Sequence, residues 1–335
     1  MIDGDACSHG RLAAASCSAC ADACPRGALE ATEEGLMLDA AACSGCGGCM
    51  AACPQGAVSL AGRDAPFVAS PRPVTEAALV CPAFGHSTGA AEVCLQALGL
   101  EQLARLWLSG LRQLTVRTAE CAACPDGCGL PVARHLDDLN ALLADRGLGG
   151  LSVRVGSGAP GAGPGISAAR HEAADPARRR LFGLGAAPAL RAAASGRALA
   201  RLQAQAGADA LDATARRVAY APRIDPDRCT GCDACIRICP ESVLFRIKAE
   251  QGTEVYGFTP GACSGCALCM DVCPVNAIVV EKQTLPAAPL ALIGFRCSAC
   301  KVDVHVPASG PWAAGPQCPI CVTTGHSGRS FQVMP

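Results

Sequence analysis

The sequence predicts a multidomain α+β protein made of several small units rather than one large core. Grouped by spacing, its 25 cysteines fall into sets of eight, five, eight and four along 335 residues. The first and third sets repeat one another around a different middle, which indicates internal duplication of one module. Aromatic residues make up only 3% of the chain, so its small units lack the large side chains that normally fill a core.

Composition divides the chain into five ranges. Residues 1–62 and 223–284 hold the two sets of eight cysteines, and residues 75–156 hold the set of five. Residues 157–222 contain no cysteine and are rich in Ala, Gly and Arg, which predicts a linker with weak helix. Residues 290–335 hold the last four cysteines and form a small C-terminal unit of their own.

The cysteine content favours metal ligation over disulfides. The N-terminal segment MIDGDACSHG has no basic stretch followed by an apolar core, so we expect a cytoplasmic protein in a reducing environment. No apolar run reaches the roughly 18 residues of a membrane span, and we expect no membrane insertion. With a net charge of −1 the chain has no basic field for nucleic acid, so the expected partners are other proteins.

The third set contains one thiol run twice, as CTGCDACIRICP from Cys229 and CSGCALCMDVCP from Cys263. Two residues between successive thiolates let a tight loop wrap one corner of an iron–sulfur cubane, and Gly231 and Gly265 let that loop turn its N–H groups toward sulfide. Proline after the fourth cysteine turns this ligand away from its own loop. Zinc sites are usually built from two pairs of ligands, so the spacing predicts 4Fe-4S clusters instead.

In these residues the chain resembles the bacterial two-cluster ferredoxins, and the resemblance covers Ile224 to Glu281. It implies that each cluster takes three ligands from one run and the fourth from the other. One cluster would be held by Cys229, Cys232, Cys235 and Cys273, and its neighbour by Cys263, Cys266, Cys269 and Cys239. Between the runs, SVLFRIKAEQGTEVYGFT predicts a hairpin around a glycine turn.

The N-terminal module repeats this pattern less regularly. The complete run CSGCGGCMAACP predicts a cluster held by Cys43, Cys46 and Cys49 with Cys24. The upstream run has Ala14 where the regular spacing requires its first cysteine, and we expect Cys7 to replace it. The other cluster would then be held by Cys7, Cys17, Cys20 and Cys53, with His9 as the alternative fourth ligand or only three protein ligands. Together the two ferredoxin-like modules are expected to hold four 4Fe-4S clusters.

The middle range alternates predicted strands and helices, which suggests a small parallel α/β sheet. Residues 77–80, 114–117 and 151–155 predict strands, and helices are expected around Leu103 and after Pro131. Cysteines follow the first two strands and would meet at the carboxyl edge of the sheet. We expect them to bind a fifth cluster, 2Fe-2S or 4Fe-4S, or zinc, with structural thiols as the alternative: Cys81, Cys121, Cys124 and Cys128.

The order of these cysteines, with Cys94 between Cys81 and the segment CAACPDGC, is similar to the delta subunit family of methyl-viologen-reducing hydrogenases. That resemblance implies a protein that links hydrogenase to heterodisulfide reductase. Cys94 itself is either an additional ligand or a core thiol.

The C-terminal range has two C-x-x-C pairs separated by seventeen residues, which is the spacing of a zinc ribbon. The pairs are Cys297 with Cys300 and Cys318 with Cys321. The second pair also resembles a rubredoxin knuckle, which implies iron. However, Lys301 and Val322 stand where rubredoxins carry glycine, so zinc in a structural or docking role is favoured.

The function that these features predict is electron transfer. Two cluster modules on one chain suggest a relay subunit of a larger redox complex, such as a hydrogenase, a formate dehydrogenase or a heterodisulfide-reductase-like assembly, with redox proteins as partners. No flavin or nicotinamide fingerprint is present. The alternatives are a reductase with its substrate site at the middle cluster, fed by the two modules, and a redox sensor or assembly protein.

Overall fold

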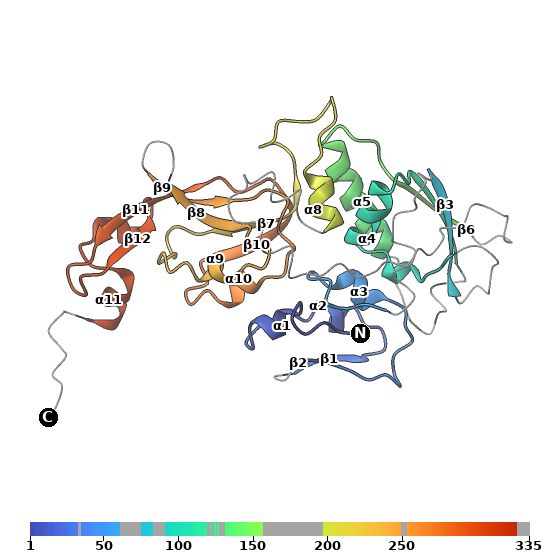
Figure 1. Ribbon diagram of the computed structural model, residues 1–335, viewed down its shortest axis with the longest axis horizontal. Coiled ribbons are helices and arrows are strands. Elements are labelled where there is room, and N and C mark those ends of the chain that lie inside the picture. The colour runs from blue at the N-terminus through green and yellow to red at the C-terminus, as the bar shows by residue number, and fades with distance from the viewer. Residues whose placement is uncertain are drawn as a thin grey trace.

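The computed structural model describes residues 1–32, 35–60, 75–82, 91–118, 121, 124, 126, 131–156, 197–248 and 253–326. The C-terminal unit lies at one end of the molecule and a parallel sheet at the other, with the two cysteine-rich modules between them (Figure 1). Within these ranges no helix is both long and apolar enough to cross a bilayer. The described cysteines form no disulfide.

The N-terminal module is made of very short elements: α1 (Ser8–Arg11), α2 (Ala19–Asp22), β1 (Leu29–Thr32), β2 (Gly35–Leu38) and α3 (Gly48–Ala52). Strands β1 and β2 form an antiparallel pair. Its apolar core is centred on Cys20, Leu29 and Val58, with half-buried cysteines packed around them. Cysteine thus occupies positions that larger apolar side chains fill in other small proteins.

The second module repeats this plan with longer strands: β7 (Val218–Ile224), α9 (Ala234–Ile238), β8 (Leu244–Lys248), β9 (Glu254–Phe258), α10 (Leu268–Asp271) and β10 (Ile278–Thr284). Strands β7 and β10 pair antiparallel. The predicted hairpin is confirmed, because β8 pairs antiparallel with β9.

The C-terminal unit is continuous with the second module rather than separate from it. Strand β11 (Leu290–Arg296) pairs with β9 on one side and with β12 (Asp303–Pro307) on the other, all antiparallel. The result is one four-stranded sheet in the order β12-β11-β9-β8. A 3-10 turn, η5 (Pro311–Ala314), and helix α11 (Pro319–Thr324) follow it.

The middle domain is the parallel α/β unit that the sequence predicts. Strands β3 (Glu76–Val80), β5 (Gln113–Arg117) and β6 (Ser152–Gly156) match the three expected strands. They form a parallel sheet in the order β4-β3-β5-β6. The edge strand β4 (Ala91–Glu92) was not predicted, because two residues carry no periodic signal.

The largest apolar core lies beside this sheet. Helix α4 (Leu100–Leu108) buries Leu103, Leu106 and Trp107, and α5 (Pro131–Ala144) buries Leu139 and Leu143. Between β4 and α4 lies the short 3-10 helix η3 (Leu95–Ala97).

Helix α8 (Ala198–Gln203) lies within the range 157–222, where the sequence predicts a linker with weak helix. It buries Leu199 and Leu202 in the core of the middle domain, and β7 also begins within that range, at Val218. The predicted linker therefore ends in a structural helix and a strand. Its residues 157–196 lie outside the described ranges.

A buried charge network joins the middle domain to the second module. Arg146, just after α5, is 2% exposed and donates to the carbonyl oxygens of Leu142, Gln203 and Arg217 at 2.9–3.1 Å. Burial lowers the pKa of Arg146 to about 10. Its neighbour Asp145 accepts two bonds from the Arg217 guanidinium, at 2.8 and 2.9 Å. Because these bonds connect α5, α8 and the start of β7, they fix the second module against the middle domain.

Candidate metal centres

Four similar turns follow the Cys-Pro pairs of the two cysteine-rich modules. In each turn the backbone N–H of the fourth residue after the cysteine donates to its sulfur, at 3.2 Å for Cys24, Cys53 and Cys273 and 3.4 Å for Cys239. Each turn contains a left-handed residue, with φ between 48° and 65°: Gly27, Gly56, Ser242 and Asn276. Hydrogen bonds to ligand sulfur are one of the means by which a protein tunes an iron–sulfur cluster.

The loops between the first cysteines of each regular run are also alike. Gly231 and Gly265 have φ of 73° and 79°, as the sequence predicts. The residue after the second cysteine is left-handed in all three regular runs, where it precedes a short helix: Gly47, Asp233 and Ala267. In the irregular upstream run the equivalent Ser18 has φ of −117°, so the missing cysteine is accompanied by a different loop.

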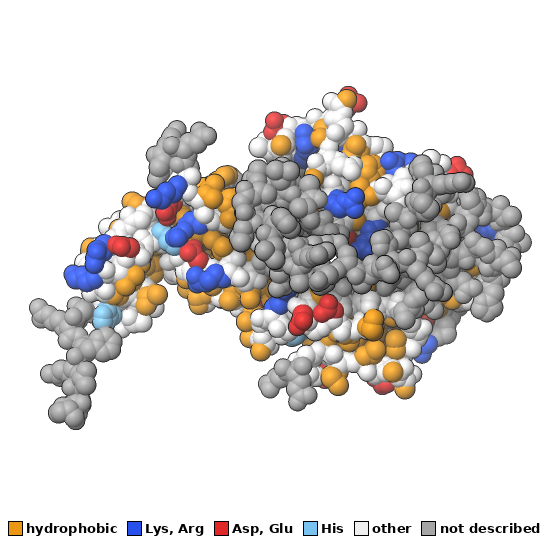
Figure 2. Space-filling view, in the orientation of Figure 1, with side chains coloured by type: hydrophobic (Ala, Val, Ile, Leu, Met, Phe, Trp, Pro, Cys, Tyr) orange, Lys and Arg blue, Asp and Glu red, His pale blue; other side chains and the backbone are white. Residues whose placement is uncertain are grey.

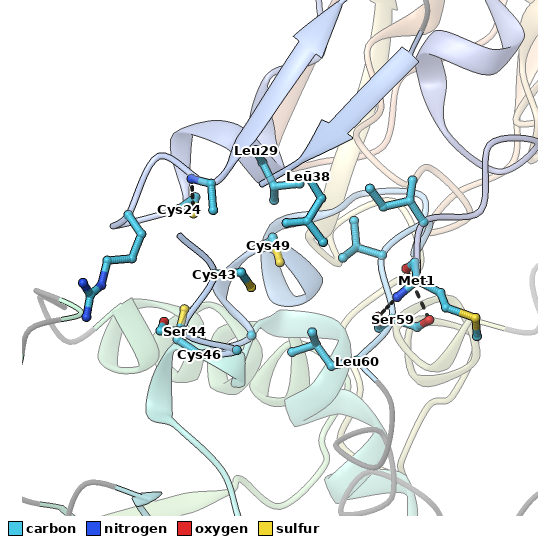
Figure 3. A pocket seen from close by; sticks show the side chains of 16 residues that line it. Met1, Cys24, Leu29, Leu38, Cys43, Ser44, Cys46, Cys49, Ser59 and Leu60 are labelled. Atoms are coloured by element: carbon cyan, nitrogen blue, oxygen red, sulfur yellow. Dashed lines mark hydrogen bonds between the residues drawn. The ribbon is translucent and has the colours of Figure 1, made fainter. Parts of the chain in front are cut away.

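Three of the four expected ligand sets each line one cavity. Cys24, Cys43, Cys46 and Cys49 surround a cavity closed by apolar residues that include Leu29, Leu38 and Leu60 (Figure 3). A second cavity is lined by Cys229, Cys232, Cys235 and Cys273, and a third by Cys239, Cys263, Cys266 and Cys269. Each set contains the Cys-Pro cysteine of the opposite run, so the chain brings together the crossed sets that the resemblance implies.

The remaining set gathers Cys7, Cys17, Cys20 and Cys53. Burial, followed by the charges of Cys53 and Cys17, raises the pKa of Cys20 to about 11. Burial also raises the pKa of Cys17, and the charges of Cys53 and Cys7 add to this shift. His9, the alternative ligand, instead donates from Nε2 to the Cys17 carbonyl oxygen at 2.8 Å.

The thiols in the second module have strongly shifted acidities. Burial, followed by the charges of neighbouring cysteines, raises the pKa of Cys235 to about 12. Burial likewise raises the pKa of Cys263 to about 12, although a hydrogen bond from the Gly265 N–H lowers it in part. Thiolates packed this closely repel one another unless a positive group lies among them. An iron–sulfur cluster supplies that positive group, so the donors present fit a cubane of iron and sulfide.

The C-terminal cysteines form a tighter site. The four sulfurs of Cys297, Cys300, Cys318 and Cys321 all lie within 4.8 Å of one another, and Cys300 Sγ is 3.9 Å from Cys318 Sγ. Tetrahedral zinc at a Zn–S distance of about 2.3 Å places its sulfurs about 3.8 Å apart, which matches this spacing. The site therefore has the size of a single ion. In the four cysteine sets expected to hold cubanes (the cubane sets), the sulfur atoms lie farther apart.

One thiol of this site has a lowered pKa. Burial would raise the pKa of Cys297, but the backbone N–H groups of Cys318, Cys300 and Ala299 outweigh it and lower the pKa to about 6. The Cys318 N–H lies 3.2 Å from Cys297 Sγ. Within the described residues, no other group of three or more donor atoms is as compact as this one.

The structure describes four of the five cysteines of the middle domain. Cys81 is buried directly after β3, and its N–H donates at 2.8 Å to the carbonyl of Arg117, the last residue of β5. Cys121 packs against the core, and the Cys124 N–H bonds to the Cys121 carbonyl at 3.2 Å. Cys94, which the sequence left as ligand or core thiol, is buried at the start of η3. Cys128 lies outside the described residues.

Sequence reasoning did not find the polar residues around one of the cubane sets. Asp233, inside the loop between Cys232 and Cys235, accepts hydrogen bonds from the Tyr256 hydroxyl at 2.6 Å and from His305 Nε2 at 2.9 Å. Tyr256 is on β9 and His305 is on β12, so strands of both the module and the C-terminal unit hold this loop. No local motif links residues so far apart in sequence.

Two family models match the chain, and both describe a 4Fe-4S dicluster domain. One covers residues 15–57 and the other residues 207–280. A search of curated proteins finds no match. The matched ranges include neither the middle domain nor the C-terminal unit, so the resemblances predicted for those two units stay predictions. The chain therefore contains two ferredoxin-type 4Fe-4S dicluster domains, which indicate a role in iron–sulfur electron transfer.

Proposed function

We propose that this chain is an electron relay with four 4Fe-4S clusters, two in each dicluster domain, and that it serves as a subunit of a larger redox complex. Hydrogenase, formate dehydrogenase and heterodisulfide-reductase-like assemblies are the classes it suits. The observation that carries the proposal is that three cavities are each lined by the four cysteines of one expected set. The clusters would supply one-electron chemistry, and the chain's part is to hold them in fixed positions.

The assignment of Cys7 to the fourth set rests on the contacts around Cys17. The charge of Cys7 contributes to the raised pKa of Cys17, after burial and the charge of Cys53. His9 is engaged with a backbone carbonyl and is oriented as a hydrogen-bond donor to it. This arrangement supports Cys7 as the ligand and His9 as a support for the loop.

The C-terminal site is proposed to hold structural zinc. Four sulfurs at the spacing of a tetrahedral ion leave no open position for a substrate, and tetrathiolate zinc has no redox chemistry. Its role would be to keep β11, β12 and α11 together against β9. Iron in the same site would give a coloured tetrathiolate centre, so metal analysis distinguishes the two ions.

Electron exchange with a partner is proposed at Cys232, whose side chain is exposed. Arg237, also exposed, donates from Nη2 to the Cys232 carbonyl oxygen at 2.6 Å, and Arg228 is exposed one residue before Cys229. Figure 2 shows Lys and Arg side chains interspersed with Asp and Glu side chains over the part of the molecule where β8, β9, β11 and β12 lie. The two exposed arginines beside Cys232 would suit an acidic redox protein.

The middle domain is proposed to bind a fifth iron–sulfur cluster. Cys81 and Cys121 follow the adjacent parallel strands β3 and β5, at the sheet edge where α/β domains place their sites. Iron content separates this arrangement from structural thiols.

The proposal is tested by purifying the protein without oxygen and measuring iron, acid-labile sulfide and zinc, followed by EPR spectra during a redox titration. Four cubanes correspond to about sixteen irons and as many sulfides per chain, and a fifth cubane raises iron to about twenty. About one zinc is expected at the C-terminal site. A colourless protein without acid-labile sulfide would refute the relay, and about eight irons would reduce it to half its clusters.

A further inference from the structure

The two dicluster domains touch each other beside two particular cysteine sets. Gln55, two residues after Cys53, donates from Nε2 to the hydroxyl of Ser264 at 2.7 Å, and Ser264 follows Cys263 directly. Ser16, directly before Cys17, donates its N–H and hydroxyl to the Asp271 carboxylate at 3.0 and 2.6 Å. Asp271 lies between Cys269 and Cys273. The interface therefore lies between the set of Cys7, Cys17, Cys20 and Cys53 and the set of Cys239, Cys263, Cys266 and Cys269.

Arg197 bridges the same two sets. Its Nη1 donates to the carbonyl oxygen of Pro54, which follows Cys53, and lies 3.8 Å from Oε1 of Glu241, two residues after Cys239. Burial raises the pKa of Glu241, and the positive charges of Arg197 and of Arg11 on α1 oppose that shift. The positive charge of Arg197 also acts on Cys263. One half-buried guanidinium thus contacts both cluster-binding segments.

The other two sets face away from this interface. Cys46 Sγ lies 3.6 Å from Gln96 Oε1 of the middle domain, and a Cβ on Gly47 would come within 2.8 Å of Ala97 Cβ. At the opposite end, a Cβ on Gly231 would meet the carbonyl oxygen of His305 on β12. One set is therefore contacted by the middle domain and the other by the C-terminal unit.

We propose that the four sets form a single unbranched electron path from the middle domain to the C-terminal unit, and that Arg197 is the positioning residue of its central junction. This inference rests on the proposed relay function. When one electron crosses the junction, the reduced cluster of one domain would lose that electron. The oxidised cluster of the other domain would gain it. No bond changes and no proton moves, and a low-potential redox protein supplies the electron.

The test compares wild type with Arg197→Gln, Arg197→Lys and Arg201→Gln, all prepared without oxygen. Arg201 is the matched control, because it is an exposed arginine in helix α8, about one turn after Arg197, which directly precedes that helix. Pulsed EPR of the fully reduced protein detects magnetic coupling between neighbouring clusters, and a redox titration gives their potentials. Iron and sulfide are measured on each sample.

In wild type we expect coupling that joins the clusters of the two domains. Arg197→Gln should weaken this coupling and lower the potentials of two clusters only, since the positive charge favours their reduced, more negative state. Arg197→Lys should restore the potentials, and Arg201→Gln should resemble wild type.

Full iron content with no coupling between the domains would overturn the path, and spectra unchanged by Arg197→Gln would overturn the role of Arg197; both would leave the relay function standing. Missing iron in wild type would instead refute the relay function itself. If Arg197→Gln alone loses iron, Gln55→Leu takes its place, since it removes one hydrogen bond of the junction and no charge. Unchanged coupling in Gln55→Leu would then also count against the path.

Discussion

The two dicluster domains build the same turns with different residues. After the Cys-Pro pairs, the left-handed position is glycine in the first domain and Ser242 or Asn276 in the second. Inside the regular runs, Gly47 of the first domain corresponds to Asp233 and Ala267 of the second. The backbone geometry is thus common to both, while the side chains at these positions are not.

The different residues at this position make different contacts with the neighbouring parts of the molecule. At this position of the first domain, Gly47 has no side chain and lies directly against the Cβ of Ala97 in the middle domain. In the second, the equivalent Asp233 uses its carboxylate to bind Tyr256 and His305. Duplication therefore preserved the cluster-binding turns and allowed the surrounding contacts to diverge.

The largest expected effect comes from removing a ligand from each domain. Cys7→Ser and Cys229→Ser should each lower iron by about four per chain, because each removes one corner of a cubane. Iron and sulfide analysis with EPR measures the loss.

His9→Gln is the control for the irregular run and should keep the iron content of wild type. Loss of iron in His9→Gln combined with full iron in Cys7→Ser would show that the histidine, not the cysteine, is the fourth ligand.

Metal binding at the C-terminal site should depend on pH differently from that of the cubane sets. Above pH of about 6, Cys297 is already ionised in the metal-free protein, so metal binding displaces no proton from it. Below that pH one additional proton must leave Cys297 when the metal binds. The slope of the logarithm of zinc affinity against pH should therefore increase by one proton per zinc. Competition between the protein and a chelator for Co²⁺ or Zn²⁺ from pH 5 to 8 measures this slope.

A slope that is constant across this range would show that Cys297 has an ordinary acidity. Cys318→Ser, which removes another ligand, should abolish tight binding at every pH and leave the iron content of the first domain unchanged.

The smallest effect is expected from exchanging the residues at one left-handed position. Gly47→Ala should destabilise the folded protein by at least about 1–2 kcal/mol, because the new Cβ meets Ala97 and the backbone conformation disfavours it. Ala267→Gly should stay within about 1 kcal/mol of wild type, since relief of strain and added chain entropy oppose each other. The midpoint of thermal unfolding measures both, and equal shifts would contradict the distinction between the domains.

Local patterns predicted much of this molecule. The three regular thiol runs, the hairpin of β8 and β9 and the strands of the parallel sheet all follow from spacing and periodicity within a few residues. Weak helix was predicted within residues 157–222, but the bounds and burial of α8 were not, because its six residues are Ala- and Leu-rich like the stretch around them and carry no capping side chain. Its burial depends on the middle domain, which sequence spacing does not reveal.

The contacts between units could not be predicted either. Gln55 with Ser264 and Arg197 with Glu241 join residues far apart in the chain, and each of these side chains is ordinary in its own segment. Of the candidate site, the ligand types and spacing were therefore accessible from sequence, while the order of the sets along the molecule was not.

The pairing of β9 with β11 sets a limit on how the chain can be shortened. A protein ending after β10 would leave the N–H and C=O groups of β9 unpaired along an exposed sheet edge, which is a template for aggregation. Truncation after β10, at the end of the second module, should therefore yield insoluble material. A fragment that keeps β11 and β12 should remain soluble, because β11 pairs with the edge of β9. The last strands act as a cover for the electron-carrying domain before them.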